Sequence, residues 1–399
     1  MLRVVCYMLY HMYMKYFFIL GSNPTLSLAE IYSLLGVRFS YKLIDKDCLL
    51  VEGGDLDETV MINQLGGTIK IGRIAKSALS ADLLSAVRDT CQPEMGKKFF
   101  FGFSTFGKVG PTKALAMKLK KALQSDGISS RWVVSKDKNL SSAAVEQSGL
   151  LKHGMEIVLI KDSERILVGV TKAIQPFKDW SFRDYGRPGR DDYSGMLPPK
   201  LARIMLNLAK PVVAENLLDP FCGSGTVLSE AVLLGCTKVI GSDISLDALE
   251  DTKNNLAWLK EKYQKVDFRC QLYQCDARKL YEIIDDHSVS RVVTEPYLGP
   301  SRNHNNQQKV IKQLNDLYSE FLVALDRILK PGGRAVMVWP VFVGGSKKIF
   351  MQPSLGGWSI AKPLPEDLVI KGDITARQTI VYGRVGQKVW REIVILVKK

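Results

Sequence analysis

The sequence predicts an α/β fold: a doubly wound, mostly parallel sheet in the C-terminal half, preceded by an α+β region. The main observation is that strand-like and helix-like runs alternate from Asn216 onward, as in TKVIGSDI followed by SLDALEDTKNNLAWLKEKY. Sheets of this kind bind ligands at the carboxyl ends of their strands. A helix is expected to begin near Pro199, and the final run TIVYGRVGQKVWREIVILVKK is expected to form a hairpin that closes the sheet edge.

The first half of the chain predicts a different, α+β arrangement. The strand-like KYFFILG is followed by a helix, SLAEIYSLLG, whose Ser27 and Glu30 have the spacing of a capping box. Two strand-like segments come next, FSYKLIDKDCLLVEG and TIKIGRIAK. Residues 97–172 form a second α+β block, with a basic helix that ends at Gly127 and a hairpin over MEIVLIKDSERILVGVTKA.

These patterns divide the chain into five parts. Residues 1–13 are expected to be a short extension, for which a mis-set start codon is one explanation. A first domain is expected over residues 14–95 and a second over 96–172. Residues 173–195 lack periodicity and combine aromatic, arginine and glycine residues, so we expect an ordered linker there. The wound α/β domain is expected over 196–399.

The charge of the chain favours a polyanionic partner, because the formal net charge is +14. Within residues 96–140, ten Lys and Arg stand against two Asp and Glu, and this surplus accounts for the whole N-terminal excess. The alternative interpretation of this basic window is a solvated face that binds nothing.

The sequence predicts neither a metal site nor a membrane span. The four histidines lie far apart and no C-x-x-C pair occurs, so we expect no zinc. The apolar opening is interrupted by His11 and Lys15, and no apolar run of 20 residues follows. Scattered thiols without a secretory signal indicate a reducing compartment, so we expect a cytoplasmic protein. The seven cysteines are Cys6, Cys48, Cys91, Cys222, Cys236, Cys270 and Cys275.

Acids at three consecutive predicted strand ends indicate a nucleotide-like site. In LLDPFCGSGTVLSEA, an acid–proline step leads into Gly223-x-Gly225, where glycines admit a ligand to the backbone and a helix N-terminus offers free N–H donors. The dinucleotide fingerprint is incomplete, because Leu228 replaces its third glycine. Asp243, about 18 residues after Gly225, is placed to bind ribose hydroxyls, and Asp276 to accept from an adenine amine. Each acid alone could equally cap a helix.

The segment VVTEPYLGP places an acid, a proline and an aromatic ring directly after a β-forming run. One interpretation is a pocket for a flat base that carries an amine. The other is a turn in which Glu295 is solvated.

Four segments in order, DPFCGSGTVLSEA, GSDIS, QCDAR and TEPYLGP, resemble motifs I to IV of class I S-adenosylmethionine-dependent methyltransferases. The match is to the amino-methylating branch, which carries an [Asn/Asp/Ser]-Pro-Pro-Tyr motif. RDYGRPGRDDYSGMLPPKLARIMLNLA is similar to the segment before motif I in THUMP-containing tRNA guanosine-N2 methyltransferases. ILGSNPTLSLAEI resembles the N-terminal ferredoxin-like domain of this family, and residues 97–172 fit a THUMP module in length and placement.

The resemblance implies that the cofactor is S-adenosylmethionine, whose sulfonium cation suits acidic and aromatic walls. The residues implied to bind it are Asp219, Pro220, Phe221, Cys222, Gly223, Gly225, Thr226, Asp243, Ile244, Asp276 and Ala277.

The implied acceptor is the exocyclic amine of guanine, whose lone pair is delocalised into the ring. Hydrogen bonds from this amine to the Glu295 carboxylate and the Pro296 carbonyl would make the nitrogen more nucleophilic, and Tyr297 would stack on the flipped base. The usual motif has two prolines and this one has a single proline. We prefer the alignment in which Glu295 takes the place of the short polar residue, because a carboxylate accepts better than a hydroxyl. In the other alignment Thr294 takes that place.

The implied reaction is methylation of the N2 amine of a guanosine in tRNA, for example at position 10 or 6. The alternatives are an rRNA guanine-N2 methyltransferase, an N4/N6 DNA amino-methyltransferase, and a non-catalytic RNA-binding protein with a degenerate cofactor site. The partner would be tRNA or rRNA, with no membrane and no metal, and the protein would be a monomer or a homodimer. The residues expected to contact phosphates are Lys108, Lys113, Lys118, Lys120, Lys121, Arg131, Arg183, Arg187 and Arg190.

Overall fold

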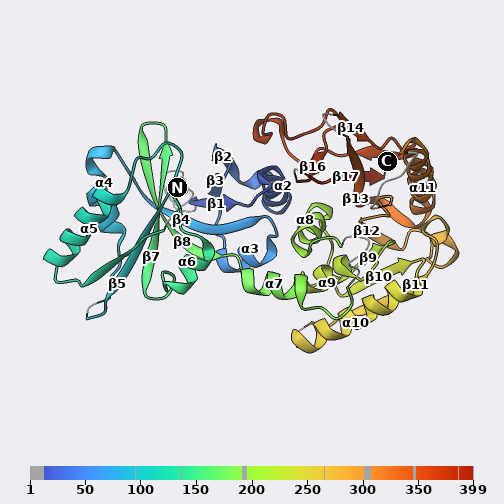
Figure 1. Cartoon of the computed structure of the whole chain (residues 1–399), viewed down its shortest axis with the longest axis horizontal. Helices are drawn as coiled ribbons and strands as arrows, with labels where there is room; N and C mark the ends of the chain where they lie inside the picture. The colour runs from blue at the N-terminus through green and yellow to red at the C-terminus, as the bar shows by residue number, and fades with distance from the viewer. Residues whose placement is uncertain are drawn as a thin grey trace, which may run out of the picture. The chain divides into compact units, whose positions relative to one another are not determined.

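The chain forms two compact units in the computed structural model (Figure 1). The N-terminal unit ends at Phe177, and the C-terminal unit begins at Lys178 and also includes the helical segment Ala29–Leu34. The predicted extension over residues 1–13 lies outside the described residues, apart from Tyr13. The structure describes residues 13–94, 96–135, 137–190, 196–264, 266–300, 307–344, 347–384 and 386–398.

The N-terminal unit is built on an eight-stranded sheet with the order β2-β3-β1-β4-β8-β7-β5-β6 (Figure 1). Its strands are β1 (Met14–Leu20), β2 (Ser40–Asp45), β3 (Cys48–Gly53), β4 (Thr68–Ala78), β5 (Phe99–Phe106), β6 (Ser130–Val133), β7 (Gly154–Asp162) and β8 (Arg165–Ile174). Its helices are α2 (Pro24–Leu35, in part), α3 (Glu58–Gln64), α4 (Leu83–Thr90), α5 (Lys113–Ser125) and α6 (Ser142–Gln147), with short 3-10 turns at Gly36–Arg38 and Ser80–Asp82.

The pairing of β4 with β8 joins the two predicted N-terminal domains. These strands are antiparallel, with Arg73 opposite Val170. Unpaired strand edges expose backbone hydrogen-bonding groups, and this pairing covers an edge on each side. Residues 14–95 and 96–172, which we expected to be separate domains, therefore share one continuous sheet.

A buried ion pair lies across this junction. Lys70 Nζ on β4 lies 2.5 Å from Glu156 Oε1 on β7 and 2.6 Å from the Leu140 carbonyl oxygen. The hydroxyls of Ser104 and Thr171 donate to the two Glu156 oxygens at 2.6 and 2.7 Å. Burial lowers the pKa of Lys70, and the charge of Glu156 opposes this. Both oxygens of the Glu156 carboxylate are thus engaged inside the sheet.

The C-terminal unit contains a nine-stranded sheet in which β11-β10-β9-β12-β13-β17-β15 are neighbours, β14 pairs with β13 and β16 pairs with β17. Its strands are β9 (Asn216–Asp219), β10 (Lys238–Asp243), β11 (Arg269–Gln274), β12 (Val289–Thr294), β13 (Leu329–Gly344), β14 (Lys347–Phe350), β15 (Trp358–Ile360), β16 (Ile380–Tyr382) and β17 (Val389–Lys398). Its helices are α7 (Phe177–Tyr185), α8 (Pro199–Ala209), α9 (Thr226–Leu233), α10 (Leu246–Lys262) and α11 (Gln307–Ile328), with 3-10 turns at Ala277–Glu282 and Glu366–Leu368.

The predicted doubly wound α/β fold is confirmed. Strands β11, β10, β9, β12 and β13 run parallel, and β17 is antiparallel to β13. Figure 1 shows α9 and α10 on one side of this sheet and α11 on the other. The α11 side chains Tyr318 and Phe321 are fully buried in a core with Leu218, Val292 and Trp339. Strands covered on both faces favour continuous apolar runs, and the inner strand β13 has one over residues 335–343, whereas the edge strand β11 does not.

Two regions differ from the prediction. The expected linker over 173–195 contains the helix α7. One of the residues that α7 buries is Arg183, so the helix lacks the apolar periodicity that would have revealed it in the sequence. Residues 191–195 lie outside the described residues. The final hairpin is present as β16 and β17, but β17 lies inside the sheet, because it pairs with β13 on one side and with β15 and β16 on the other. In the part of the chain that the structure describes, no helix is both long and apolar enough to span a membrane.

Candidate active site

The acids predicted to form a site come together at one edge of the C-terminal sheet. Asp219 ends β9 and Asp243 ends β10, while Asp276 follows β11 by two residues. The register pairs Gly241 with Asp219 and Asp243 with Gln274. Because these strands are parallel neighbours, their carboxyl ends meet at the same edge.

The turn after β9 requires its two glycines. Gly223 and Gly225 have φ values of +50° and +78°, a region that favours glycine. A Cβ on Gly225 would lie 2.9 Å from the Thr252 side chain, whereas a Cβ on Gly223 would meet no atom within 4 Å. Gly225 is also the N-cap residue of α9. The turn therefore presents open backbone at Gly223, directly before a helix N-terminus.

Asp243 is held in place and still has acceptor capacity. Its Oδ2 accepts from the Gly223 N–H at 3.0 Å and its Oδ1 from the Ser245 N–H at 2.9 Å. Each carboxylate oxygen has two lone pairs, so each can accept one further hydrogen bond. The neighbouring Ile244 side chain is 71% exposed. This arrangement suits a ligand with two adjacent hydroxyls.

Asp276 is engaged by its own neighbour. It caps the following 3-10 turn through the Arg278 N–H, and the Arg278 Nη2 lies 2.6 Å from its Oδ2. The hydrogen bonds from Arg278 lower the pKa of Asp276, so the group is an ionised acceptor. Ala277, the next residue, is buried. Phe221 packs its ring edge-on against Phe321 at a centroid distance of 5.3 Å.

Asp219 is the most deeply buried acid of the site, with 2% of its surface exposed. Its Oδ1 accepts from the Thr294 hydroxyl at 2.7 Å and from the Phe221 N–H at 3.3 Å. Burial raises the pKa of Asp219 to about 7 in spite of these bonds, and the charges of Asp243 and Glu295 add to the effect. The proton of the Thr294 hydroxyl is therefore committed to Asp219.

Glu295 forms an ion pair that the sequence analysis did not foresee. Its partner is Arg391 on β17, whose Nε donates to Oε1 and whose Nη2 donates to Oε2 at 3.2 Å. The two side chains are 12% and 14% exposed. Burial raises the pKa of Glu295, and Arg391 opposes this shift. No local signal could have revealed a partner that lies 96 positions away in the sequence.

The two residues after Glu295 differ in exposure. Pro296 is buried, whereas the Tyr297 side chain is 56% exposed. The Tyr318 hydroxyl on α11 donates to the Tyr297 carbonyl at 2.7 Å, which fixes the backbone there. The backbone of Tyr297 is therefore anchored beside the end of β12, and much of the residue's surface is open.

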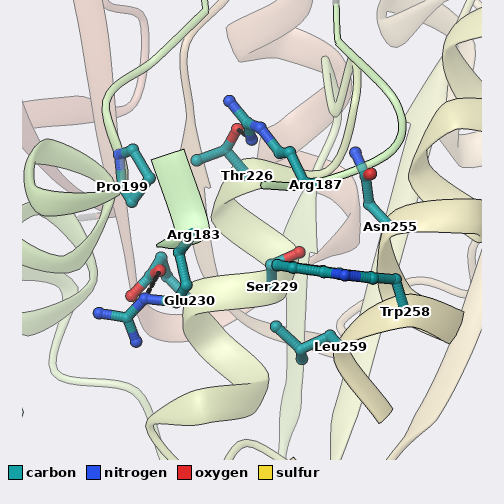
Figure 2. Close-up of a pocket in the computed structure, with 9 residues that line it drawn as sticks. All are labelled: Arg183, Arg187, Pro199, Thr226, Ser229, Glu230, Asn255, Trp258 and Leu259. Atoms are coloured by element: carbon teal, nitrogen blue, oxygen red, sulfur yellow. Dashed lines mark hydrogen bonds and ion pairs between the residues drawn. The ribbon is translucent and has the colours of Figure 1, made fainter. Parts of the chain in front are cut away.

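A small pocket lies beside α9, between α7, α8 and α10, and involves two of the predicted phosphate-binding arginines. Figure 2 shows Arg183 beside Glu230 and Arg187 beside Thr226. Arg183 stacks over Trp180 at 3.9 Å and pairs with Glu230 at 3.2 Å, while Arg187 donates to the Thr226 hydroxyl. The pocket is lined by Arg183, Arg187, Pro199, Thr226, Ser229, Glu230, Asn255, Trp258 and Leu259.

Two of the nine residues expected to contact phosphates, Arg183 and Arg187, lie inside the C-terminal unit. Arg183 and Arg187 are 7% and 6% exposed, and burial lowers the pKa of Arg187. Each guanidinium group is bound to partners within its own unit, so neither is free to meet a phosphate. Arg190, by contrast, is exposed.

The basic window remains on the surface of the N-terminal unit. Helix α5 buries Ala116, Leu119 and Leu123 in the core of the N-terminal unit, and its lysines are exposed. The window's predicted phosphate-binding residues, all exposed, are Lys108, Lys113, Lys118, Lys120, Lys121 and Arg131. Within the described residues, no group of three or more His, Cys, Asp and Glu side chains is placed to hold a metal ion.

Comparison with known proteins places the C-terminal unit in a described family. The family described as RMKL-like, methyltransferase domain, matches residues 187–341. A tRNA (guanine(10)-N2)-dimethyltransferase of Methanothermobacter thermautotrophicus is 36% identical over 151 residues, which are 38% of this chain and 40% of that protein. The chain thus spans less than half the length of this relative.

Two further relatives extend the similarity. A probable tRNA (guanine(10)-N2)-dimethyltransferase of Methanothermococcus thermolithotrophicus is 31% identical over 30% of this chain and 72% of that sequence. The tRNA (guanine(10)-N2)-dimethyltransferase of Pyrococcus abyssi is 26% identical over 82% of this chain and 88% of its own length.

One solved structure resembles the chain from end to end. TrmN of Thermus thermophilus has 17% sequence identity and a TM-score of 0.54, over 96% of this chain and 100% of that one. At this identity the likeness concerns the fold, and it includes both units.

Proposed function

The chain belongs to the RMKL-like methyltransferase family, whose curated relatives are named for the N2 atom of guanine in tRNA, and we propose that it methylates this amine. The observation that carries the proposal is the edge where β9, β10, β11 and β12 end. There, a glycine turn, three acids and the segment Thr294–Tyr297 lie on adjacent parallel strands. This is the arrangement that a shared site for a cofactor and a base requires.

We propose S-adenosylmethionine as the cofactor, and the residues present fit it. Asp243 keeps two lone pairs for ribose hydroxyls, and Gly223 leaves its backbone open to close approach. Asp219 and Asp243 bring two carboxylates to the same edge, which favours a cation. When bound, the cofactor supplies the methyl group on a positively charged sulfur.

The chain's own contribution would be to position and polarise the acceptor amine. Glu295 would accept a hydrogen bond from the N2 amine, which withdraws the nitrogen lone pair from the ring and makes it a better nucleophile. The Pro296 carbonyl would accept the second amine hydrogen. The exposed ring of Tyr297 would stack on the flipped guanine, since aromatic stacking compensates for the loss of base stacking.

The hydrogen bonds support Glu295 rather than Thr294 as the acceptor. The Thr294 hydroxyl is buried and donates to Asp219, so it faces the neighbouring strand end. Glu295 contacts Arg391 through one edge of its carboxylate and keeps further lone pairs.

We propose tRNA as the substrate, held in part by the basic window. Its exposed lysines on α5 would contact phosphates, which supplies affinity without sequence preference. The curated relatives are named for guanine 10, and one that is 27% identical is named for guanine 6. We propose position 10 as the first site to test, because more of the relatives carry that name.

The test is a methyl-transfer assay followed by nucleoside mass spectrometry. Purified protein is incubated with S-adenosylmethionine and a tRNA transcript that carries guanosine at position 10, and with the same transcript carrying adenosine there. We expect N2-methylated guanosine in the first RNA and none from that position in the second. Binding of the cofactor without methylation of tRNA, rRNA or DNA would contradict the proposal and indicate a non-catalytic RNA-binding protein.

A further inference from the structure

The last strand of the chain reaches the active-site edge through Arg391. In the sheet, β17 lies next to β13, which lies next to β12, and Arg391 is opposite Pro340 of β13. Its guanidinium crosses β13 and meets both oxygens of Glu295, the first residue after β12. Two parallel N–H donors on two carboxylate oxygens fix the position and the plane of the carboxylate.

Arg391 is the cation that faces Glu295 among the described residues. The other titratable groups close to the pair are Tyr318 of α11, Asp219 of β9 and Tyr382 of β16, beside Tyr297 in the motif itself. None of these carries a positive charge. A carboxylate in this position without Arg391 would be buried among neutral and acidic groups, which favours its protonated form.

The pair leaves Glu295 able to accept from a substrate. A carboxylate has about four lone-pair sites, and the Arg391 fork takes two of them. The two that remain lie away from the guanidinium. An ionised, oriented carboxylate with free lone pairs is what hydrogen bonding to an amine requires, whereas a protonated one would donate on one side and accept weakly on the other.

We propose that Arg391 is a positioning residue for the amine methylation proposed above, on which this inference rests: it orients Glu295 and keeps it an ionised acceptor. The opposite role is a block, in which Arg391 occupies the carboxylate and must move before the substrate binds. The two roles predict opposite effects of removing the arginine, so one set of variants separates them.

The main experiment compares pH–rate profiles of Arg391→Met and Arg391→Lys with that of the wild type. In Arg391→Met, Glu295 loses its cation, so we expect a rate at pH 7 that is lower by roughly ten- to a hundredfold and that recovers as the pH rises. Each unit by which the pKa of Glu295 lies above the assay pH costs roughly tenfold in ionised acceptor. Arg391→Lys keeps the charge but loses the fork, so its rate should fall while its pH profile stays like that of the wild type.

The chain offers a matched control on the same strand. Glu392, next to Arg391, forms its own two-bond pair with Arg377, and successive residues of a strand face opposite sides. Arg377→Met therefore removes a comparable two-bond pair on the other face of the strand, and Arg377→Lys keeps its charge but loses the fork. We expect these controls to lower the unfolding temperature without changing the pH profile of methyl transfer.

The pH dependence of the unfolding temperature reports on the protonation of Glu295 independently of activity. Its pKa in the folded protein is raised, so stability falls as pH rises from the ordinary glutamate range through the folded value. Arg391→Met should raise the folded pKa further, so we expect its unfolding temperature to decrease more steeply than that of the wild type between pH 5 and pH 8. Arg377→Met should keep the wild-type slope.

The outcomes separate this inference from the proposed function. If the wild type transfers no methyl group to any guanosine, the proposed function and the positioning role of Arg391 are both wrong. If the wild type is active and Arg391→Met has the wild-type rate and pH profile, the positioning role alone is wrong. A faster Arg391→Met enzyme would establish the block instead. Should Arg391→Met fail to fold, a full wild-type rate in Arg391→Lys would equally overturn the positioning role.

Discussion

Two glutamates with little exposed surface, one in each unit, are held in different ways. Glu156 in the N-terminal sheet accepts from Lys70, Ser104 and Thr171, so its oxygens are surrounded by internal donors. Glu295 at the edge of the C-terminal sheet is held by one guanidinium, on one side. A carboxylate that is enclosed by internal donors serves the fold. One that is anchored on a single side is stable and still has lone pairs for a ligand.

The largest expected effect is the loss of methyl transfer when the Glu295 carboxylate is removed. Glu295→Ala should reduce methyl transfer by roughly a hundred- to ten-thousandfold, because the amine loses its acceptor, and should leave cofactor affinity nearly unchanged. The measurements are single-turnover methyl transfer and a cofactor titration. Glu366→Ala, which changes an exposed glutamate of the same unit, is the control and should be fully active. Full activity of Glu295→Ala would remove the catalytic assignment.

The ion pair of the Glu156 carboxylate should contribute to the stability of the protein. Lys70→Met leaves Glu156 buried without its cation, so the free energy of unfolding should fall by about 3–5 kcal/mol. Denaturant unfolding followed by circular dichroism measures this change. The control is Lys42→Met, which breaks a pair with Asp162 whose lysine is 58% exposed, and it should cost less than about 1 kcal/mol. Equal losses of unfolding free energy in Lys70→Met and Lys42→Met would contradict the stabilising role of the buried pair.

Asp219 differs from both glutamates, because the partners of its carboxylate are the Thr294 hydroxyl and the Phe221 N–H, and neither is a cation. Its pKa of about 7 means that the folded protein holds a proton there at lower pH. A cationic cofactor favours the ionised form, so its affinity should rise with pH up to about 7 and then level off, by roughly tenfold between pH 6 and pH 8. Calorimetric titrations at several pH values test this, and Asp219→Asn should show no such rise.

The hydroxyl beside Asp219 should shift this profile in a known direction. The Thr294 bond lowers the pKa of Asp219, so Thr294→Val should move the midpoint of the affinity profile to higher pH. The expected loss is about 1 kcal/mol of cofactor binding at pH 7, typical of one hydrogen bond. A midpoint that stays in place, or moves to lower pH, would show that the hydroxyl does not stabilise the carboxylate.

The smallest effects are expected for the exposed charges of the basic window. Lys118→Ala and Lys121→Ala should each weaken tRNA binding a few-fold and reduce the slope of log affinity against log salt by about one. Filter binding at several salt concentrations measures this slope. Lys371→Ala, an exposed lysine outside the window, should leave the slope unchanged. A salt-independent affinity in the wild type would favour the solvated-face interpretation.

Local patterns sufficed to predict the doubly wound fold and the three acids at its edge. Asp219, Asp243 and Asp276 each end or closely follow a strand-like segment, and parallel strands bring such positions to the same edge of the sheet. The motif at Glu295 was found for the same reason.

The contacts between distant segments could not be predicted. The Glu295–Arg391 and Lys70–Glu156 pairs join residues 96 and 86 positions apart, and a single sequence does not indicate which strands become neighbours. The same limit applies to the burial of Arg183 and Arg187, which the sequence does not indicate. A basic residue in an aperiodic segment reads as a surface charge unless the buried acceptors Glu230 and Thr226 are known.

The backbone pairing of β4 with β8 has a practical consequence for transferring the N-terminal unit to another protein. A fragment that begins at residue 96 would contain β8 without its partner β4, and an unpaired strand edge can pair with strands of other molecules. The piece to transfer is thus the entire eight-stranded sheet, with both of its halves.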